Sequence, residues 1–310
     1  MRRIRKNSRW LGNVASLMLA GAAMCQGQMA SQQLRVRQQA PIAMGSLPSG
    51  ILVVLGVHGK LSLVRSDTGA TSPIKETLGY FSPADMTSSR VFDRDVIFVT
   101  MYSTSVFAAQ QSVERRGLVT EYSSDGQPMH TWSALNRAFD GITVDPSRGL
   151  LYLGDGVRGE ISTLDLQQNA TAEPKSFIEV AGISRLGSLA FDPDRQRLFA
   201  ADVGKGGIYV VDLQARKSRP LVSSLGEPAA LAYDATKARL YVADAARRCI
   251  WQVPLNGRSP RASVFSSASE LREPRGLAID AGGNLWVADF GAQAVFKLGP
   301  RGEIVQKVPH

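Results

Sequence analysis

The chain is poor in the residue types that most often carry catalysis or crosslinks. It has only two cysteines and three histidines in 310 residues. Cys25 lies in an N-terminal segment that we expect to be removed, which leaves Cys249 without an intrachain disulfide partner. The sequence also contains no G-x-S-x-G elbow, no phosphate-binding loop and no cluster of cysteine and histidine. These absences argue against a zinc site of the Cys/His type, an α/β-hydrolase and a nucleotide-dependent enzyme.

Long hydrophobic runs are lacking too, apart from one near the start. Residues 1–9 carry five basic residues and no acid, and residues 10–24 are mostly apolar and small. This order is typical of a secretory signal peptide, and the apolar run is short for a membrane span. We therefore predict a signal peptide over residues 1–30 and an exported protein, periplasmic or secreted. Cys25 leaves a lipid anchor open as an alternative, although Met24 stands where a small residue is expected.

The basic character of the chain comes largely from that leader. The formal net charge is +9, and residues 1–30 contribute five of these positive charges, so +4 remains for residues 31–310. Both signs are interleaved over that part of the sequence. Binding to nucleic acid needs a dense basic stripe, so we expect no nucleic-acid partner.

An internal repeat dominates the rest of the sequence. Two short strand-like segments, each ending in Asp, recur as a pair with a turn between them. The pairs are GITVD and LYLGD (141–145, 151–155), SLAFD and LFAAD (188–192, 198–202), ALAYD and LYVAD (230–234, 240–244), and GLAID and LWVAD (276–280, 285–289). The second Asp recurs at steps of 47, 42 and 45 residues. A period near 45 with strand-like units predicts a β-propeller.

Two degraded copies extend the repeat toward the N-terminus. Residues 50–67 and 94–103 overlay the second strand of the pair, with Gly56 and Met101 in the place of the second Asp. We therefore predict an all-β protein: a six-bladed propeller of four-stranded antiparallel blades over residues 50–310, after a linker at 31–49. The tail 302–310 is expected to complete a sheet begun near the N-terminus and so to close the ring.

An aromatic residue occupies the same position in each clear copy, at Tyr152, Phe199, Tyr241 and Trp286. We expect these rings to pack between neighbouring blades, since repeated large apolar residues usually fill a core.

The repeat resembles that of the NHL family and, more loosely, that of the senescence-marker-protein/gluconolactonase family. PRGLAIDAGGNLWVAD (274–289) carries the pattern P-x-G-[IL]-A-[VI]-D…G-N-[LI]-[YW]-V-A-D almost residue for residue. The resemblance is good over residues 138–300 and poor over 50–137. It implies a β-propeller but little about activity, because propellers host unrelated functions.

The gluconolactonase resemblance implies one divalent metal at the channel mouth, held by Glu, Asn and Asp. Phe139-Asp140-Gly141-Ile142 resembles the family's P-D-G motif for the Asp, without its proline. No Asn occurs in SPADMTSS (82–89) and no acid in PIAMGSLPSG (41–50), where the other two ligands are expected. Loss of two oxygen ligands argues against lactone hydrolysis by that mechanism.

Strand direction places the candidate site residues on one face of the ring. The inner strand runs out to the first Asp and the next strand returns, so each second Asp lies near the start of an inner strand. The residues expected on this face are Asp140, Asp155, Asp202, Glu227, Asp244, Arg275 and Asp289, with His58 within reach of it. A structural interpretation of each second Asp is that it accepts N–H groups of the following turn.

Two classes of function follow. The first is an exported, monomeric module that binds a protein, a glycan or a small molecule through a ligand face at His58, Asp140, Asp244 and Arg275. The alternative is a divergent metal-dependent hydrolase or lactonase, in which Asp140 with Asp155, Asp202 or Asp289 holds one divalent cation, Ca²⁺ or Zn²⁺. The missing ligands favour the binding module.

Overall fold

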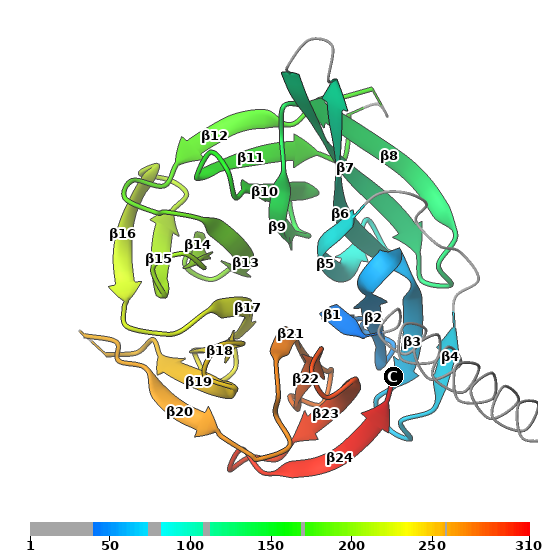
Figure 1. Ribbon diagram of the computed structural model, residues 1–310, viewed down its shortest axis with the longest axis vertical. Coiled ribbons are helices and arrows are strands. Elements are labelled where there is room, and N and C mark those ends of the chain that lie inside the picture. Colours follow the sequence, from blue (N-terminus) through cyan, green and yellow to red (C-terminus); the bar gives the residue numbers. More distant parts are fainter. Residues whose placement is uncertain (1–39, 74–81, 108–111, 169–170, 258) are drawn as a thin grey trace, which may run out of the picture. The chain divides into compact units, whose positions relative to one another are not determined.

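The structure of residues 40–310 is a ring of six four-stranded antiparallel sheets, the predicted β-propeller (Figure 1). It is a computed structural model that describes residues 40–73, 82–107, 112–168, 171–257 and 259–310, without the side chains of His58 and of residues 104–107 and 112–114. The predicted signal peptide and the Cys25 anchor lie outside these residues. None of the helices described is long and apolar enough to cross a membrane.

Four consecutive strands build each blade, in order from the axis outward. The inner strands are β1 (Pro41–Ser46), β5 (Ser82–Val91), β9 (Phe139–Asp145), β13 (Leu186–Asp192), β17 (Pro228–Asp234) and β21 (Pro274–Ile279). The second strands are β2 (Ile51–Gly56), β6 (Arg94–Phe107), β10 (Leu150–Asp155), β14 (Arg197–Asp202), β18 (Arg239–Asp244) and β22 (Leu285–Asp289). We number the blades 1 to 6 in this order.

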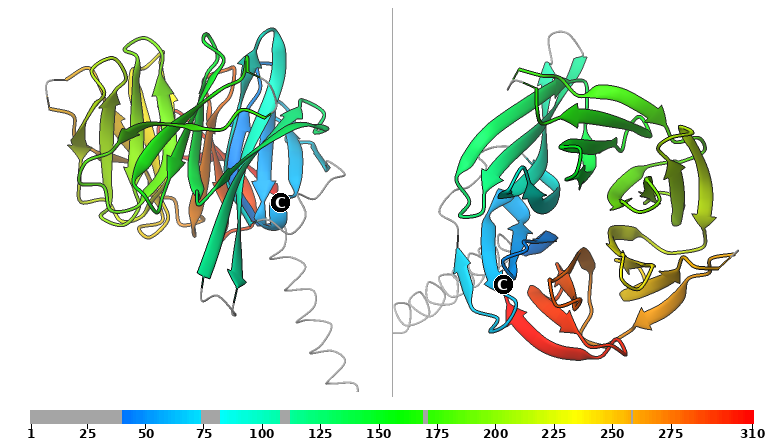
Figure 2. Two further views of the ribbon diagram at one scale, coloured as in Figure 1. Left: turned by 90° about the horizontal axis from the view of Figure 1, so that it is seen from above. Right: turned by 180° about the vertical axis from the view of Figure 1, so that it is seen from behind.

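The outer half of each blade, formed by the third and outer strands, is more exposed than the inner half. The third strands are β3 (Leu61–Arg65), β7 (Ser112–Ser123), β11 (Glu160–Asp165), β15 (Gly207–Asp212), β19 (Cys249–Pro254) and β23 (Ala294–Leu298). The outer strands are β4 (Thr71–Pro73), β8 (Pro128–Leu135), β12 (Lys175–Glu179), β16 (Lys217–Val222), β20 (Ser263–Ser266) and β24 (Ile304–Pro309). One 3-10 turn, η1 (Val57–Gly59), joins β2 to β3. The β6–β7 hairpin of blade 2 is longer than the others and projects from one side of the ring (Figure 2).

The propeller begins earlier than the predicted boundary at residue 50. Pro41–Ser46, inside the predicted linker, is the inner strand of blade 1. Ala43 and Met44 are buried there against neighbouring blades. The segment lacks the Asp of the repeat, so the pattern did not reveal it.

The prediction that residues 302–310 complete an N-terminal sheet is wrong. β24 pairs with β23 inside blade 6, and blade 1 is built from β1 to β4 alone. The ring closes by side-chain packing between those two blades, where Met44 and Val54 meet Trp286 and Val308. Gly276 belongs to this contact, because an added Cβ would lie 2.9 Å from the backbone of Ala43.

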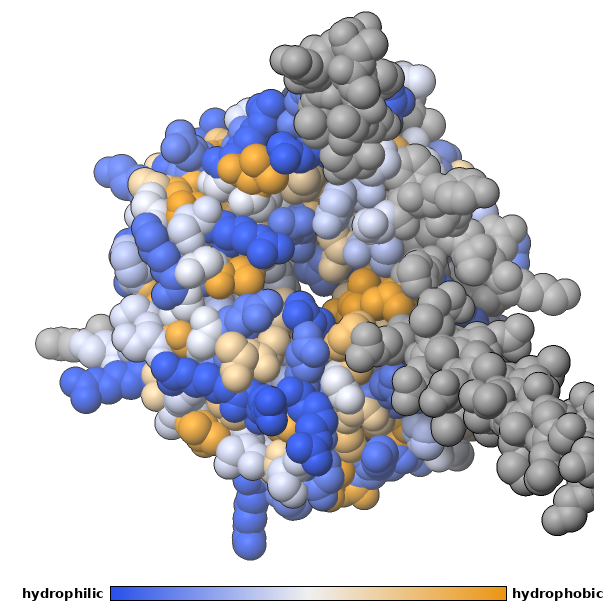
Figure 3. Space-filling model, in the orientation of Figure 1, coloured by the Kyte–Doolittle hydropathy of each residue, from blue (hydrophilic) through white to orange (hydrophobic). Residues whose placement is uncertain are grey.

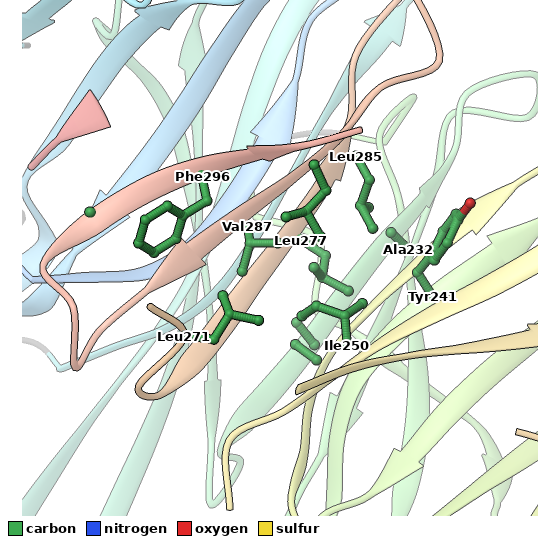
Figure 4. Packing of buried hydrophobic residues seen from close by; sticks show 12 residues of the cluster. Ala232, Tyr241, Ile250, Leu271, Leu277, Leu285, Val287 and Phe296 are labelled. Atoms are coloured by element: carbon green, nitrogen blue, oxygen red, sulfur yellow. The ribbon is translucent and has the colours of Figure 1, made fainter. Parts of the chain in front are cut away.

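Apolar faces of neighbouring sheets form the core. Between blades 5 and 6, Tyr241 and Ile250 pack against Leu277, Val287 and Phe296 (Figure 4). The repeated aromatic position behaves as predicted. Tyr152, Phe199, Tyr241 and Trp286 are no more than 3% exposed and lie in clusters between blades.

Candidate functional site

The second Asp of each clear repeat is a buried hydrogen-bond acceptor. Asp155, Asp202, Asp244 and Asp289 are all 0% exposed. Asp202 shows the pattern: its carboxylate accepts the N–H groups of Gly204 and Lys205 in the turn that follows, at 3.2 and 3.1 Å. It also accepts the N–H and hydroxyl of Ser184 and the N–H of Arg185, in the loop that enters its own blade.

The other three carboxylates bind the same two places. The loop donors are Ala138 to Asp155, Gly226 and Glu227 to Asp244, and Arg272 and Glu273 to Asp289, at 2.7 to 3.4 Å. The turn donors are Val157 and Arg158, Arg247, and Ala292. The structural interpretation of these aspartates is therefore confirmed, and it extends to a second loop that the sequence did not indicate.

Burial raises the pKa of the Asp202 and Asp244 carboxyls, but their hydrogen bonds outweigh this effect. The net result is a lowered pKa in both, through Ser184 for Asp202 and through the amides of Arg247, Glu227 and Gly226 for Asp244. Both side chains are thus held as carboxylates, whose role is to fix backbone.

Because each of them fixes backbone N–H groups, we call Asp155, Asp202, Asp244 and Asp289 the clamps. Three of the clamps hold the backbone of residues at the channel mouth. Asp202 holds the amide of Arg185, Asp244 that of Glu227, and Asp289 that of Glu273. All three of these residues line a cavity of about 360 Å³, to which Asp140 and Arg275 also contribute. Figure 3 shows the hollow at the centre of the ring, bordered largely by hydrophilic residues and on its right by an apolar group.

Charges of both signs meet in this mouth. The Arg275 guanidinium lies 2.6 Å from Glu273 Oε1 and 3.6 Å from Glu227 Oε1, and its side chain is 35% exposed. It also lies over the Phe290 ring, 5.9 Å from the centroid. Burial raises the pKa of Asp140, Arg185 lowers it and Asp155 raises it, for a net increase.

Below the mouth, the inner strands of all six blades enclose a second cavity of about 240 Å³. Asp85 of β5 is the one carboxylate among its lining residues. Asp85 Oδ1 accepts the N–H of Met86 at 2.8 Å, and Oδ2 accepts that of Ile142, in blade 3, at 3.3 Å. Ser188, which also hydrogen-bonds to Asp85, lines both cavities. Burial is the main reason why the pKa of Asp85 is raised to about 7.

The structure thus separates the predicted site residues into two sets. Asp140 and Arg275 share the mouth. The four clamps lie behind the mouth, one in each of blades 3 to 6: Asp155, Asp202, Asp244 and Asp289. Within the described residues, no group of three or more His, Cys, Asp or Glu side chains is arranged to hold a metal ion. His58 belongs to η1, and its side chain lies outside the described part of the chain.

Sequence reasoning missed Asp85, Arg185, Glu273 and Tyr102, which line the mouth or the channel. The sequence could have indicated Asp85, because Met101 marks the end of the second strand in blade 2. Counting back from it through a tight turn places SPADMTSS on the inner strand. The arginine, the glutamate and the tyrosine carried no repeat signature.

Comparison with known families supports the interpretation of the repeats. Residues 186–310, which are blades 4 to 6, match the model of the "SMP-30/Gluconolactonase/LRE-like region" family. The predicted resemblance is confirmed over this region. The match begins at the first residue of β13, later than the start of the clear repeats at residue 138. No curated protein sequence matches the chain.

Solved propellers share the fold at low sequence identity. A nidogen/laminin complex structure aligns with a TM-score of 0.66 at 15% identity, covering 84% of this chain and 93% of that chain. The PQQ-bound aldose sugar dehydrogenase of Streptomyces coelicolor aligns with 0.61 at 18%, covering 82% and 89%. An auxiliary nutrient binding protein of Bacteroides thetaiotaomicron aligns with 0.57 at 13%, covering 82% and 67%. At such identities the likeness establishes the fold alone.

Proposed function

We propose that the protein is a binding propeller whose ligand is a small polar molecule held at the channel mouth. The observation that carries this proposal is the convergence of Asp140, Arg185, Glu227, Glu273 and Arg275 on one cavity of about 360 Å³. Ligands of closed β-architectures usually bind where loops from several units meet, in a cavity with a few convergent polar groups.

The mouth suits a ligand with both hydrogen-bond donors and acceptors. Its carboxylates accept hydrogen bonds, while its guanidinium groups donate them in a fixed fork. Apolar surface from Ile42, Val57 and Phe290 lines the same cavity. A sugar, a sugar acid or a zwitterion matches this mixture better than a purely apolar molecule or a polyanion.

The backbone of the mouth is held in place before a ligand arrives, and this supports a binding function. The clamps at Asp202, Asp244 and Asp289 fix the backbone of mouth residues before any ligand arrives. Rigid polar groups lose little conformational entropy on binding, which favours affinity. The structural neighbours include a nutrient-binding protein, a protein complex and sugar dehydrogenases. A cavity of this volume fits the small-molecule members of that range best.

The alternative is a metal-dependent hydrolase or lactonase in which Asp140 shares a Ca²⁺ or Zn²⁺ ion with Asp155, Asp202 or Asp289. The resemblance to the gluconolactonase-like family, matched over residues 186–310, favours it. The chain supplies few oxygens for such an ion, because the three partner carboxylates already accept backbone N–H groups. A cation that binds the folded state raises the melting temperature. Millimolar Ca²⁺ or Zn²⁺ that leaves the melt of wild type unchanged would exclude this alternative.

The test of the binding proposal is a thermal-shift screen of the full chain against sugars, sugar acids and amino acids, followed by calorimetry on the compounds that stabilise it. Arg275→Ala and Asp140→Asn are expected to weaken the best compound at least about tenfold, the usual effect of removing a charged partner. Arg301→Ala and Asp194→Asn make the same changes at exposed positions outside the mouth and should bind as wild type does. Equal affinity in all four variants would refute the proposal.

We also propose that the protein is exported, to the periplasm or beyond, and acts there as a monomer. The basic and apolar order of residues 1–30 supports this location. N-terminal sequencing of the mature protein decides the point: a start between about residue 21 and 31 agrees with signal cleavage, and an intact Met1 contradicts it. A blocked N-terminus at Cys25 would instead identify the lipid-anchored form.

A further inference from the structure

The register of the blades makes Asp85 an exception on the channel wall. Asp85 lies opposite Thr100, and the corresponding pairs in other blades begin with Ala43, Gly141, Ala230 and Gly276. Ser188 takes this position in blade 4, one residue before the Leu189–Ala200 pair. Five blades thus carry a small residue at the level where blade 2 carries a carboxylic acid.

Asp85 is held in place by its neighbours in the strand pair. The hydroxyl of Thr100, which is 0% exposed, accepts the N–H of Asp85 at 3.1 Å and donates to its carbonyl oxygen at 3.2 Å. The positions that correspond to Thr100 include Gly154, Ala243 and Ala288. Blade 2 is therefore specialised at two paired positions that together fix one carboxyl at the axis.

In the described part of the chain, no cationic side chain lines this cavity. Its other polar side chains are hydroxyls, from Ser46, Thr87, Ser88, Thr143, Ser188 and Tyr233. Among the described residues Ser88 Oγ is buried without a hydrogen-bond partner. The cavity therefore presents one negative charge and several oxygen acceptors, with no positive group among its described lining residues to match them.

The backbone adds further acceptors. The N–H groups of Met86 and Ile142 donate to Asp85, and that of Leu231 donates to Ser188 Oγ at 3.3 Å, so these residues turn their peptide groups toward the axis. In an antiparallel ladder the C=O of a residue points to the same side as its N–H. Met44, Leu189 and Leu277 hold the same register in their blades. Carbonyl oxygens of all six inner strands thus face the cavity at this level.

We propose that the channel cavity is a binding site for a primary ammonium group, held by a charge-assisted hydrogen bond to Asp85. An ammonium carries three donors and a single charge, which match one carboxylate surrounded by neutral oxygens. The volume of about 240 Å³ is ample for it, since one water occupies roughly 30 Å³. Met44, Met86 and Phe191 line the same cavity and accommodate a short alkyl group.

This site is distinct from the mouth, although Ser188 lines both cavities. The charged or titratable groups on the elements around Asp85 include Asp140 on β9, Arg185, Glu227 and Glu273 in the loops before β13, β17 and β21, Tyr233 on β17, Arg275 on β21 and Tyr102 on β6. At the opposite ends of the strands they include Arg90 on β5, Arg94 and Asp95 on β6, Asp145 on β9, Asp192 on β13 and Asp234 on β17. Of these, Tyr233 alone lines the channel cavity. Asp140 further raises the pKa of Asp85, which burial has brought to about 7. An ammonium binds the ionised carboxyl, so its affinity should rise with pH and level off above 7.

The experiment is calorimetry and thermal melting of the full chain with methylammonium chloride at pH 8. Sodium, potassium and tetramethylammonium chlorides at equal ionic strength are the comparison salts. We expect methylammonium to raise the melting temperature above the effect of all three, and to bind about tenfold more weakly at pH 6 than at pH 8. Tetramethylammonium should have no specific effect, because it has no N–H donor.

Variants separate this site from the mouth. Asp85→Asn should abolish the methylammonium effect, because it removes the only carboxylate among the described residues that line the cavity. Asp194→Asn and Arg275→Ala should keep it, whatever Arg275→Ala does to ligands of the mouth. Equal stabilisation by potassium, a methylammonium effect that survives in Asp85→Asn, or no effect in wild type would overturn the proposal.

Discussion

Blades 3 to 6 and blades 1 and 2 share one strand plan but differ in what ends the second strand. Blades 3 to 6 place a buried aspartate there, and each such aspartate binds two loops of its own blade. Blades 1 and 2 have Gly56 and Met101 instead. The residues that break the repeat, Asp85 and Thr100, lie in blade 2. Regular positions in this propeller therefore build the scaffold, and the exceptional positions supply the unusual chemistry of the channel.

The largest effect is expected where the two classes of blade meet. Trp286→Ala should lower the free energy of unfolding by about 3–5 kcal/mol, because it leaves a cavity in a fully buried cluster. It also removes the indole donor to Asp280, at 2.8 Å. Urea denaturation measures the change. A loss below about 1 kcal/mol would mean that closure of the ring does not depend on this packing.

Removal of a clamp in a regular blade should come next. Asp202→Ala leaves the amides of Arg185, Gly204 and Lys205 without their acceptor and should cost about 3 kcal/mol. The pKa of Asp202 is lowered in the folded protein, so its contribution is present above the unfolded value and is lost as the pH falls through the folded one. The gap between wild type and variant should therefore narrow in strong acid. Asp194→Asn, at an exposed turn, is the control and should be neutral.

Asp85 should respond in the opposite direction. Its pKa is raised to about 7, so the folded protein keeps a proton that the unfolded chain releases near pH 4. Stability is then lost as the pH rises from about 4 to 7, and the penalty stays constant above that. Because the pKa of Asp85 rises by about 3 on folding, Asp85→Asn should be more stable than wild type by at most about 4 kcal/mol at pH 8 and equal to it near pH 4. Melts across this pH range test the sign, and a destabilised variant at pH 8 would place Asp85 among the clamps.

The smallest effect on stability is expected at the mouth. Glu273→Gln weakens an ion pair whose partner Arg275 is one-third exposed, and should change stability by less than about 0.5 kcal/mol. If the mouth binds a ligand as proposed, the same variant should lose affinity in calorimetry. Stability and affinity falling together would indicate that Glu273 supports the fold rather than the ligand.

The sequence revealed the regular part of this comparison well. The fold, the six blades, the aromatic core positions and the turn-binding role of the second Asp all follow from a repeated pattern. It failed where the pattern is absent. Pro41–Ser46 lacks the closing Asp and was assigned to a linker, and residues 302–310 were paired with the wrong blade.

Most of the candidate site could not be predicted from the sequence either. Asp140 and Arg275 were expected on one face of the ring from strand direction alone, and both line the mouth cavity. The hydrogen bonds from each clamp to the loop before the inner strand were not predicted. The donor in that loop lies 16 to 18 residues before the aspartate, and the loop sequences share no fixed pattern. Asp244 was therefore expected to face a ligand, whereas its carboxylate is 0% exposed behind Glu227.

The sequence by itself determined the kind of ring, since alternating strands with a fixed period can bury their apolar faces only against copies of themselves. Only the tertiary structure decided which polar residues meet at the axis, how the ends of the ring join and which carboxyl is difficult to ionise. The physical reason is that burial and convergence are properties of six strands brought together from distant parts of the chain. A side chain such as Asp85 acquires its unusual environment from neighbours that lie more than fifty residues away in the sequence.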